Sequence, residues 1–595
     1  MAQPTVPCDA AVNSDYDSKS SKERPTVTGM RRTVLASCLA ALGLAACSTT
    51  SSMTSMAGVT QPSGSLAGTY LAANLAAAEG DLKGAAGFYA DTLKDDPDNA
   101  DILSRTFLFA AESGQIPKAI VLTDRVLALD TDNRPAQLVR QMGKLGAKDY
   151  AGLLGDLSSD GSGGFTALTN AIVRAWALAG TKDVDGALNA LDSLTAQRGV
   201  DGIRLMHRAL ILDYAGHDDD ADKAYNQAIM VMGTGPRVSD AYGRFLLRKG
   251  RVDDAKVLYT RVLAENPGHP VATQALREIG ARKSAQPLIA SPAEGVAEGL
   301  FGISASLTDR RSAEVAILYL NLTLYLHPDF DLARVLLASR YENMGRYEMA
   351  NSIYAGITPS SPYYAMTQVQ SAINDGRQGQ TDSGIQKMKA LAASQPNQPD
   401  VWTALGDLLR SAERYSESAS AYDKAIGGVP QGDRRLVGLY YARGVAFERS
   451  DHWNDAERDF RAALKINPDR ADVLNYLGYS WIDRGMHYEE AVSMLEKARA
   501  LRPLDGFIAD SVGWAYYRLG RYQDAARTLE EAVQLAPGAA DVNDHLGDAY
   551  WRVGRKTDAR FQWQHALSMN PDASQKPVIE RKLQFGLEAV AVSGP

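Results

Sequence analysis

The side chains that most often carry out chemistry are few in this 595-residue chain, and they do not gather into a motif. The three cysteines, Cys8, Cys38 and Cys47, all lie near the N-terminus, so residues 48–595 hold no thiol nucleophile, thiolate zinc ligand or disulfide. The histidines form no His-Glu-x-x-His pair, which would place two zinc ligands on one helix face. They are scattered along the chain as His207, His217, His269, His327, His452, His487, His545 and His565.

Two short segments could still bind an ion or a phosphate. His217–Asp222 reads His-Asp-Asp-Asp-Ala-Asp, but clustered aspartates are more typical of the start of a helix, whose dipole favours negative charge. Gly161–Gly164 reads Gly-Ser-Gly-Gly and lacks the Gly-Lys-Ser/Thr that completes a phosphate-binding loop. We therefore expect no metal site, no cofactor and no catalytic site.

Length and charge narrow the functional classes further. A single hydrophobic core stops growing at roughly 250–300 residues, so this chain needs several domains or a repeat array. It carries 63 Lys and Arg against 71 Asp and Glu, a net charge of −8, with no basic cluster. Nucleic-acid binding depends on clustered cations that neutralise phosphates. The composition argues against a nucleic-acid partner.

The N-terminal segment has the pattern of a secretory signal. A Met-Arg-Arg start at residue 30 precedes an apolar run, residues 34–46, that is too short to span a membrane as a mature helix. The run ends in Leu-Ala-Ala-Cys-Ser around Cys47, which resembles the lipobox of bacterial lipoproteins. That resemblance implies that Cys47 is lipidated and begins the mature chain, and Ser48 implies the outer membrane, on its periplasmic face. The alternative is an apolar N-terminal helix that happens to contain a cysteine.

The C-terminal third of the chain repeats itself. Gly444, Gly478, Gly513 and Gly547 follow one another in steps of 34, 35 and 34 residues, and a period of about 34 is that of tetratricopeptide repeats. The resemblance to this family is most specific in residues 399–432, although Ser418 replaces the usual Ala. The matching residues there are Trp402, Leu405, Gly406, Ala425 and Pro430. The resemblance implies an all-α, right-handed superhelical solenoid of helix-turn-helix units.

One repeat position extends this pattern over nearly the whole chain. The twentieth residue of each unit is Ala in eleven of fourteen cases, and ten of the thirteen steps between them are 34 residues. We expect a small residue here, and Gly at the eighth position, because the two helices of a unit cross closely. We expect Tyr516, Tyr550, Phe460 and Trp563 to fill the space between units. The series is Ala85, Ala119, Leu153, Ala187, Ala221, Ala255, Ala316, Ala350, Gly384, Ser418, Ala456, Ala491, Ala525 and Ala559.

A 61-residue step from Ala255 to Ala316 breaks the register. The Pro- and Ser-bearing residues 281–292 lie within it and have no helical period. We therefore interpret them as a linker between two halves, which together hold about 14 units. The predicted organisation is a leader and signal (1–47), a flexible tether (48–65), an N-terminal array (66–280), the linker (281–292), a C-terminal array (293–573), and a capping helix with a tail (574–595). Whether translation begins at Met1 or Met30 stays open.

A tetratricopeptide solenoid offers a wall made by the first helix of each unit, where positions 2, 5, 9 and 12 usually face a partner. In the last three units these positions combine aromatic rings with carboxylates, which suits a segment carrying Lys or Arg. The alternative is that the rings pack between units and the aspartates are solvated. The predicted protein-binding groove consists of Asn475, Tyr479, Asp510, Trp514, Tyr517, Asp544, Asp548 and Trp551.

The C-terminal third also resembles a narrower group, the repeat lipoproteins of Gram-negative envelopes. The strings that carry this resemblance are residues 474–483, 508–521 and 544–551. One member of the group is the lipoprotein partner of a carboxyl-terminal processing protease, to which it delivers peptidoglycan hydrolases. The resemblance implies a non-catalytic scaffold or adaptor with those protein partners. Two alternatives stay open, namely an assembly or pilot lipoprotein of an envelope secretion or export machine, and an undetected enzyme.

Overall fold

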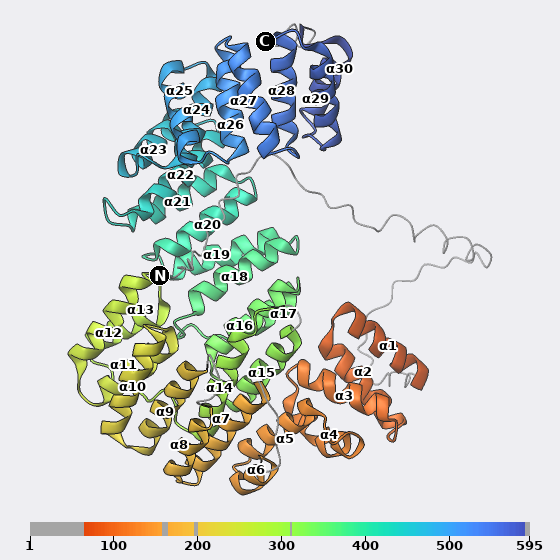
Figure 1. The fold of residues 1–595 in the computed structure, drawn as a ribbon, viewed down its shortest axis with the longest axis vertical. Helices are drawn as coiled ribbons and strands as arrows, with labels where there is room; N and C mark the ends of the chain where they lie inside the picture. The colour runs from red at the N-terminus through yellow and green to blue at the C-terminus, as the bar shows by residue number, and fades with distance from the viewer. Residues whose placement is uncertain (1–64, 158–164, 195–199, 310–311, 589–595) are drawn as a thin grey trace, which may run out of the picture. The chain divides into compact units, whose positions relative to one another are not determined.

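The computed structural model describes residues 65–157, 165–194, 200–309 and 312–588, in which helices are the regular secondary structure (Figure 1). These ranges hold 30 α-helices, which confirms the predicted all-α solenoid. They divide into two compact units, residues 65–396 (the N-terminal unit) and residues 397–588 (the C-terminal unit). The predicted signal, Cys47, the tether and the glycine-rich segment 161–164 lie outside the described residues.

In the N-terminal unit, consecutive helices pack as pairs, with α13 as the exception. The pairs are α1 (Leu66–Glu79) with α2 (Leu82–Asp95), α3 (Ala100–Glu112) with α4 (Ile116–Leu129), α5 (Arg134–Gly146) with α6 (Tyr150–Asp156), α7 (Phe165–Gly180) with α8 (Val184–Asp192), α9 (Asp201–Ala215) with α10 (Asp218–Met232), α11 (Pro236–Arg248) with α12 (Val252–Glu265), α14 (Pro292–Ser306) with α15 (Ala313–Leu326), α16 (Asp331–Asn343) with α17 (Tyr347–Tyr354), and α18 (Tyr364–Arg377) with α19 (Thr381–Ser394); α13 spans Pro270–Gly280.

The C-terminal unit continues the pattern with five pairs and a last single helix, so the described chain holds the predicted 14 pairs. The pairs are α20 (Pro399–Ser411) with α21 (Tyr415–Gly427), α22 (Arg435–Arg449) with α23 (Trp453–Ile466), α24 (Ala471–Arg484) with α25 (Tyr488–Leu501), α26 (Gly506–Arg518) with α27 (Tyr522–Leu535), and α28 (Ala540–Arg552) with α29 (Lys556–Ser568); the single helix is α30 (Lys576–Phe585).

The predicted register of small residues marks the closest approach within each pair. Each of its fourteen members lies on the second helix of a pair and is buried. Gly384 and Ser418, two of the three residues in the register that are not Ala, show how closely the two helices of a pair approach. A Cβ on Gly384 would lie 2.5 Å from the carbonyl oxygen of Ala372 on the facing helix, and the Ser418 hydroxyl donates to the carbonyl oxygen of Gly406 over 2.8 Å. The register is therefore set by backbone-to-backbone contact.

The eighth-position glycines face a large side chain of the same pair. A Cβ on Gly444 would lie 2.6 Å from the Phe460 ring, and one on Gly547 would lie 2.5 Å from the Trp563 ring. Phe460 and Trp563 therefore pack inside their own units, which the repeat pattern did not predict. The Phe460 ring also contacts Tyr476 of the next unit, with ring centroids 5.2 Å apart, as expected for a residue between units. Tyr516 and Tyr550 do bridge units, because their hydroxyls donate to Glu496 and Glu530 of the preceding second helices at 2.6 and 2.8 Å.

The inner side of the N-terminal unit is filled by its own helices. The first helices α3, α5, α7 and α9 pack against α14 and α15, which lie inside the arc of α3–α11 in Figure 1. One continuous hydrophobic cluster includes residues of α3–α12 and the buried side chains of α14 and α15. Polar contacts reinforce this packing, since Asn321 of α15 donates to the Glu112 carbonyl oxygen over 2.7 Å and Arg237 of α11 pairs with Glu298 of α14.

Two glycines, one helical turn apart, allow α14 to approach α7. A Cβ on Gly295 would lie 2.2 Å from the Trp176 ring, and one on Gly299 would lie 2.7 Å from Ile172. The Trp176 indole in turn donates to His207 Nδ1 over 3.0 Å, and burial lowers the pKa of His207 to about 4. A neutral His207 can accept this bond at Nδ1, so the buried indole nitrogen of Trp176 has a hydrogen-bond partner in the contact between α7 and α9.

The compact units differ from the predicted halves. Residues 281–291 connect α13 to α14 without a helix, yet they lie inside the N-terminal unit rather than at its end. The reason is the packing of α14 and α15 against α3–α9, which joins both sides of this connection in one core. At the other end, the helix expected within residues 574–595 is α30, which packs on α29.

The filled inner side predicts that α15 belongs to the core of the N-terminal unit. Leu322 is fully buried, so Leu322→Ala should lower the free energy of unfolding of this unit by about 2–5 kcal/mol. Val315→Ala on the same helix, where the side chain is 46% exposed, should change it by less than about 0.5 kcal/mol. Fluorotryptophan NMR of Trp176, the one tryptophan of residues 65–396, reports this unfolding transition in urea. Equal effects of the two substitutions would contradict the assignment.

Candidate protein-binding surface

The first helices of the C-terminal unit form a wall, because α24 contacts α26 and α26 contacts α28 in addition to their own partners. The predicted groove residues lie on these three helices: Asn475 and Tyr479 on α24, Asp510, Trp514 and Tyr517 on α26, and Asp544, Asp548 and Trp551 on α28. The wall is less open than expected. Asn475, Asp510, Asp548 and Trp551 are buried, and the other four are partly buried.

The middle of the wall is a stack of three rings. Trp514 stacks on Tyr517 with ring centroids 4.8 Å apart. His545 of α28 also stacks on Trp514, with ring centroids 4.1 Å apart. His545 Nδ1 lies 2.9 Å from Asp510 Oδ1. This arrangement joins two predicted residues, Asp510 and Trp514, through a histidine that sequence reasoning did not single out.

Electrostatics keep His545 charged. Burial alone would lower its pKa, but Asp510 and then Asp544 and Asp541 outweigh burial and raise the pKa of His545 to about 9. The resulting imidazolium donates to Asp510 and presents its charge to the Trp514 ring, which is a favourable cation–π arrangement. The carboxylate of Asp510 is therefore already paired within the chain.

The end of the wall is closed by Lys582 of α30. Its Nζ lies 2.8 Å from Asp544 Oδ2 and 2.8 Å from Asp548 Oδ2, and the Lys582 side chain is 7% exposed. Burial raises the pKa of Asp548, while the Trp563 indole donates to its second oxygen over 3.0 Å. The two carboxylates thus share one buried cation from the chain itself.

Trp551 is also held by the C-terminal segment. Its indole nitrogen donates to both carboxylate oxygens of Glu588, at 2.9 and 3.0 Å, and its ring packs against Trp563 with centroids 5.4 Å apart. The side chain is 7% exposed. Trp551 therefore holds the C-terminal segment that follows α30 and is largely shielded from solvent.

These contacts change what the predicted groove offers. Its three carboxylates are paired with His545 and Lys582, so the accessible part of the wall consists of the partly buried rings of Tyr479, Trp514 and Tyr517. Lys582 lies 34 residues after Asp548, at the same repeat position. Extending the register into α30 could therefore have identified this partner.

Of the two segments considered for ion or phosphate binding, only the acidic segment His217–Asp222 lies within the described residues. Asp218, Asp219 and Asp220 occupy the first turn of α10, which confirms that the acidic run begins a helix, and Asp222 pairs with Arg251 at 2.8 Å. In the described part of the chain, no group of three or more His, Cys, Asp or Glu side chains could hold a metal ion. None of the described helices is long and apolar enough to cross a membrane.

The His545 contacts predict a pH-dependent stability. Because the folded-state pKa lies above the ordinary value of 6.5, the stabilisation is complete below pH 6.5 and is lost as the pH rises through 9. His545→Gln should therefore lower the unfolding free energy at pH 6 by on the order of 3 kcal/mol more than at pH 10. Urea unfolding at the two pH values measures this difference. Exposed His452→Gln is the control, and the same pH-dependence in wild type and His545→Gln would refute the assignment.

Comparison with known proteins bears on the repeats directly. Models of the tetratricopeptide repeat match residues 370–433, 437–470 and 512–574. Over 144 residues the chain is 28% identical to TPR repeat-containing protein PA4667 of Pseudomonas aeruginosa, which covers 24% of each protein. Over 177 residues it is 26% identical to Protein O-mannosyl-transferase TMTC1 of Homo sapiens, which covers 28% of this chain and 20% of that protein. The chain thus spans about a quarter or less of these relatives.

Two solved structures are similar to this chain at TM-scores below 0.5. A tetratricopeptide repeat protein from Parabacteroides merdae superposes with a TM-score of 0.36 and 16% identity, over 43% of this chain and 97% of that one. A chain of the APC/C hetero-tetramer Cut9–Hcn1 gives a TM-score of 0.35 and 15% identity, over 87% of this chain and 96% of that one. The family models thus identify tetratricopeptide repeats within residues 370–574 of this chain.

Proposed function

We propose that the chain is a non-catalytic scaffold that binds other proteins through the first-helix wall of its C-terminal unit. The observation that carries this proposal is the contrast between the two units. In the N-terminal unit the first helices α3–α9 are covered by α14 and α15, so that face has no room for a partner. In the C-terminal unit, α30 packs on α29 and reaches the last first helix, α28, through Lys582, while the Tyr479, Trp514 and Tyr517 side chains of the wall are only partly buried.

The partner chemistry follows from the accessible rings of the wall. Tyr479, Trp514 and Tyr517 are partly buried, so each is fixed in orientation while part of its ring surface stays accessible. Fixed aromatic rings bind a polypeptide at low cost in side-chain entropy, and they attract Lys and Arg over their faces. A segment with Lys or Arg remains the partner that this wall suits.

The proposal places the scaffold in the bacterial cell envelope. Its support is the signal-like segment before Cys47 and the resemblance of residues 474–483, 508–521 and 544–551 to envelope lipoproteins. Cys47 would carry the lipid that holds the scaffold at the periplasmic face of the outer membrane. The partners would be a carboxyl-terminal processing protease and the peptidoglycan hydrolases presented to it.

Affinity capture from an envelope extract tests the scaffold and its partners together. The mature protein should retain a processing protease and a cell-wall hydrolase, and Trp514→Ala should reduce this capture about thirtyfold, as expected for a central aromatic contact worth roughly 2 kcal/mol. Phe561→Ala is the matched control, because this ring is 68% exposed on α29, outside the wall. Recovery of secretion components instead would favour an assembly lipoprotein. Hydrolase or transferase activity of the purified protein would overturn the non-catalytic assignment.

Substitution of Cys47 tests the proposed lipid attachment. Cys47→Ser removes the sulfur that the proposed lipid would modify, so incorporation of radiolabelled fatty acid in cells should be abolished. Cys38→Ser, inside the apolar run, should leave incorporation unchanged. Labelling that persists in Cys47→Ser would contradict the anchor and leave the protein-binding proposal standing.

A further inference from the structure

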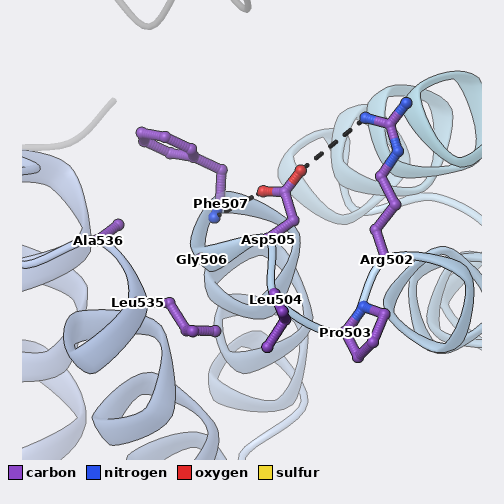
Figure 2. Close-up of a pocket in the computed structure, with 8 residues that line it drawn as sticks. All are labelled: Arg502, Pro503, Leu504, Asp505, Gly506, Phe507, Leu535 and Ala536. Atoms are coloured by element: carbon purple, nitrogen blue, oxygen red, sulfur yellow. Dashed lines mark hydrogen bonds and ion pairs between the residues drawn. The ribbon is translucent and has the colours of Figure 1, made fainter. Parts of the chain in front are cut away.

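A shallow hollow lies at the edge of the C-terminal unit, where α25 leads into α26. It is lined by Arg502, Pro503, Leu504, Asp505, Gly506, Phe507, Leu535 and Ala536, and Figure 2 shows Leu504 and Leu535 facing each other across it. Three of these apolar side chains are strongly exposed: Leu504 is 81% exposed, Leu535 40% and Phe507 37%. Clustered exposed apolar side chains of this kind mark interaction sites more often than isolated ones do.

The neighbouring repeats show that the fold does not require these residues. The loops before α24 and α28 have the same length as the loop before α26. At the position of Leu504 they carry Asp469 and Gly538, and at the position of Phe507 they carry Asp472 and Asp541. The same helical junction is thus built twice with polar or small residues, so the apolar pair has another role.

The hollow is rigid on the side of α26. Asp505 is the N-cap of this helix, and its carboxylate accepts hydrogen bonds from the backbone nitrogens of Phe507 and Ile508 at 3.1 and 3.2 Å. Gly506 lies so close to α27 that an added Cβ would meet the Ala536 Cβ at 2.8 Å. A preformed hollow loses little conformational entropy when it is occupied.

Charge at the rim distinguishes between partners. Arg502 is 49% exposed, and its ion pair with Asp505 is long, 4.0 Å (Figure 2). Asp505 is already engaged by two backbone amides, so the Arg502 guanidinium has donors to offer to a further carboxylate. The rim therefore favours an anionic group beside the apolar hollow.

We propose that this hollow, the Leu504 hollow, binds a bulky apolar side chain of a partner polypeptide that carries an acidic side chain next to it. The proposal rests on the protein-binding function and adds a second contact outside the ring stack of the wall. Leu504, Phe507 and Leu535 bury the apolar side chain, and Arg502 pairs with the neighbouring carboxylate. The occupant is a polypeptide of apolar–acidic sequence, in contrast to the Lys- or Arg-bearing segment suited to the wall.

A peptide array tests this recognition directly. The purified chain is applied to immobilised Gly/Ser dodecapeptides that carry one central Leu or Phe followed by Glu, Lys or Ser. Binding to the Glu peptides should exceed binding to the Lys peptides at least fivefold. Leu504→Ser should reduce it about tenfold, as expected when one apolar contact of about 1.4 kcal/mol is lost. Leu519→Ser, which replaces a 40% exposed leucine of the same unit, is the matched control.

A charge reversal separates the apolar contact from the ion pair. Arg502→Glu should invert the preference, so that Lys peptides bind better than Glu peptides while Leu504 still contributes. Equal binding of Glu and Lys peptides, unchanged binding by Leu504→Ser, or no signal above the Gly/Ser background would overturn the proposal. The outcome is independent of the capture experiment, because Trp514→Ala should leave array binding unchanged. If Trp514→Ala reduces partner capture as expected but no array peptide binds the wild-type chain, this inference is refuted and the proposed function is not.

Discussion

The close approach of two helices at a single small residue is the constraint on which the structure depends. The residue at the twentieth position of each unit is buried, and two departures from Ala show its contact with the facing backbone directly. Gly384 leaves room for a carbonyl oxygen, and Ser418 bonds to one. Because each pair is fixed in this way, a large ring such as Phe460 can fill the interior beside its facing glycine, and the remaining faces are available to neighbouring units.

This constraint is local, which explains what the sequence could predict. The 34-residue spacing of the small residues sufficed to predict the 14 pairs, and helical spacing sufficed for α30. The packing of α14 and α15 inside the N-terminal unit was not predicted, because its cause is a contact between distant segments. Gly295 and Gly299 make sense only beside Trp176 and Ile172 of α7. The one local signal was the apolar character of α14 and α15 on all sides, which is typical of a buried helix.

The candidate site shows the same division between local and distant information. The repeat positions correctly brought Asp510, Trp514, Asp544 and Asp548 onto neighbouring helices. They could not show that His545 and Lys582 pair with the three carboxylates, since a pairing depends on side-chain reach across helices. The wall therefore offers aromatic rings rather than free negative charge. The Leu504 hollow differs from the equivalent loops of the neighbouring repeats, which carry polar or small residues at the positions of Leu504 and Phe507.

The N-terminal unit is closed by its own helices, and we propose for this reason that binding falls to the C-terminal unit. Residue-resolved hydrogen exchange tests this closure most directly, because amides in a packed core open only with the unit itself. The amides of α14 and α15 should exchange as slowly as those of α7 and α9. Exchange of α14 and α15 that is orders of magnitude faster than that of α7 and α9 would show a displaceable hairpin and contradict the claim.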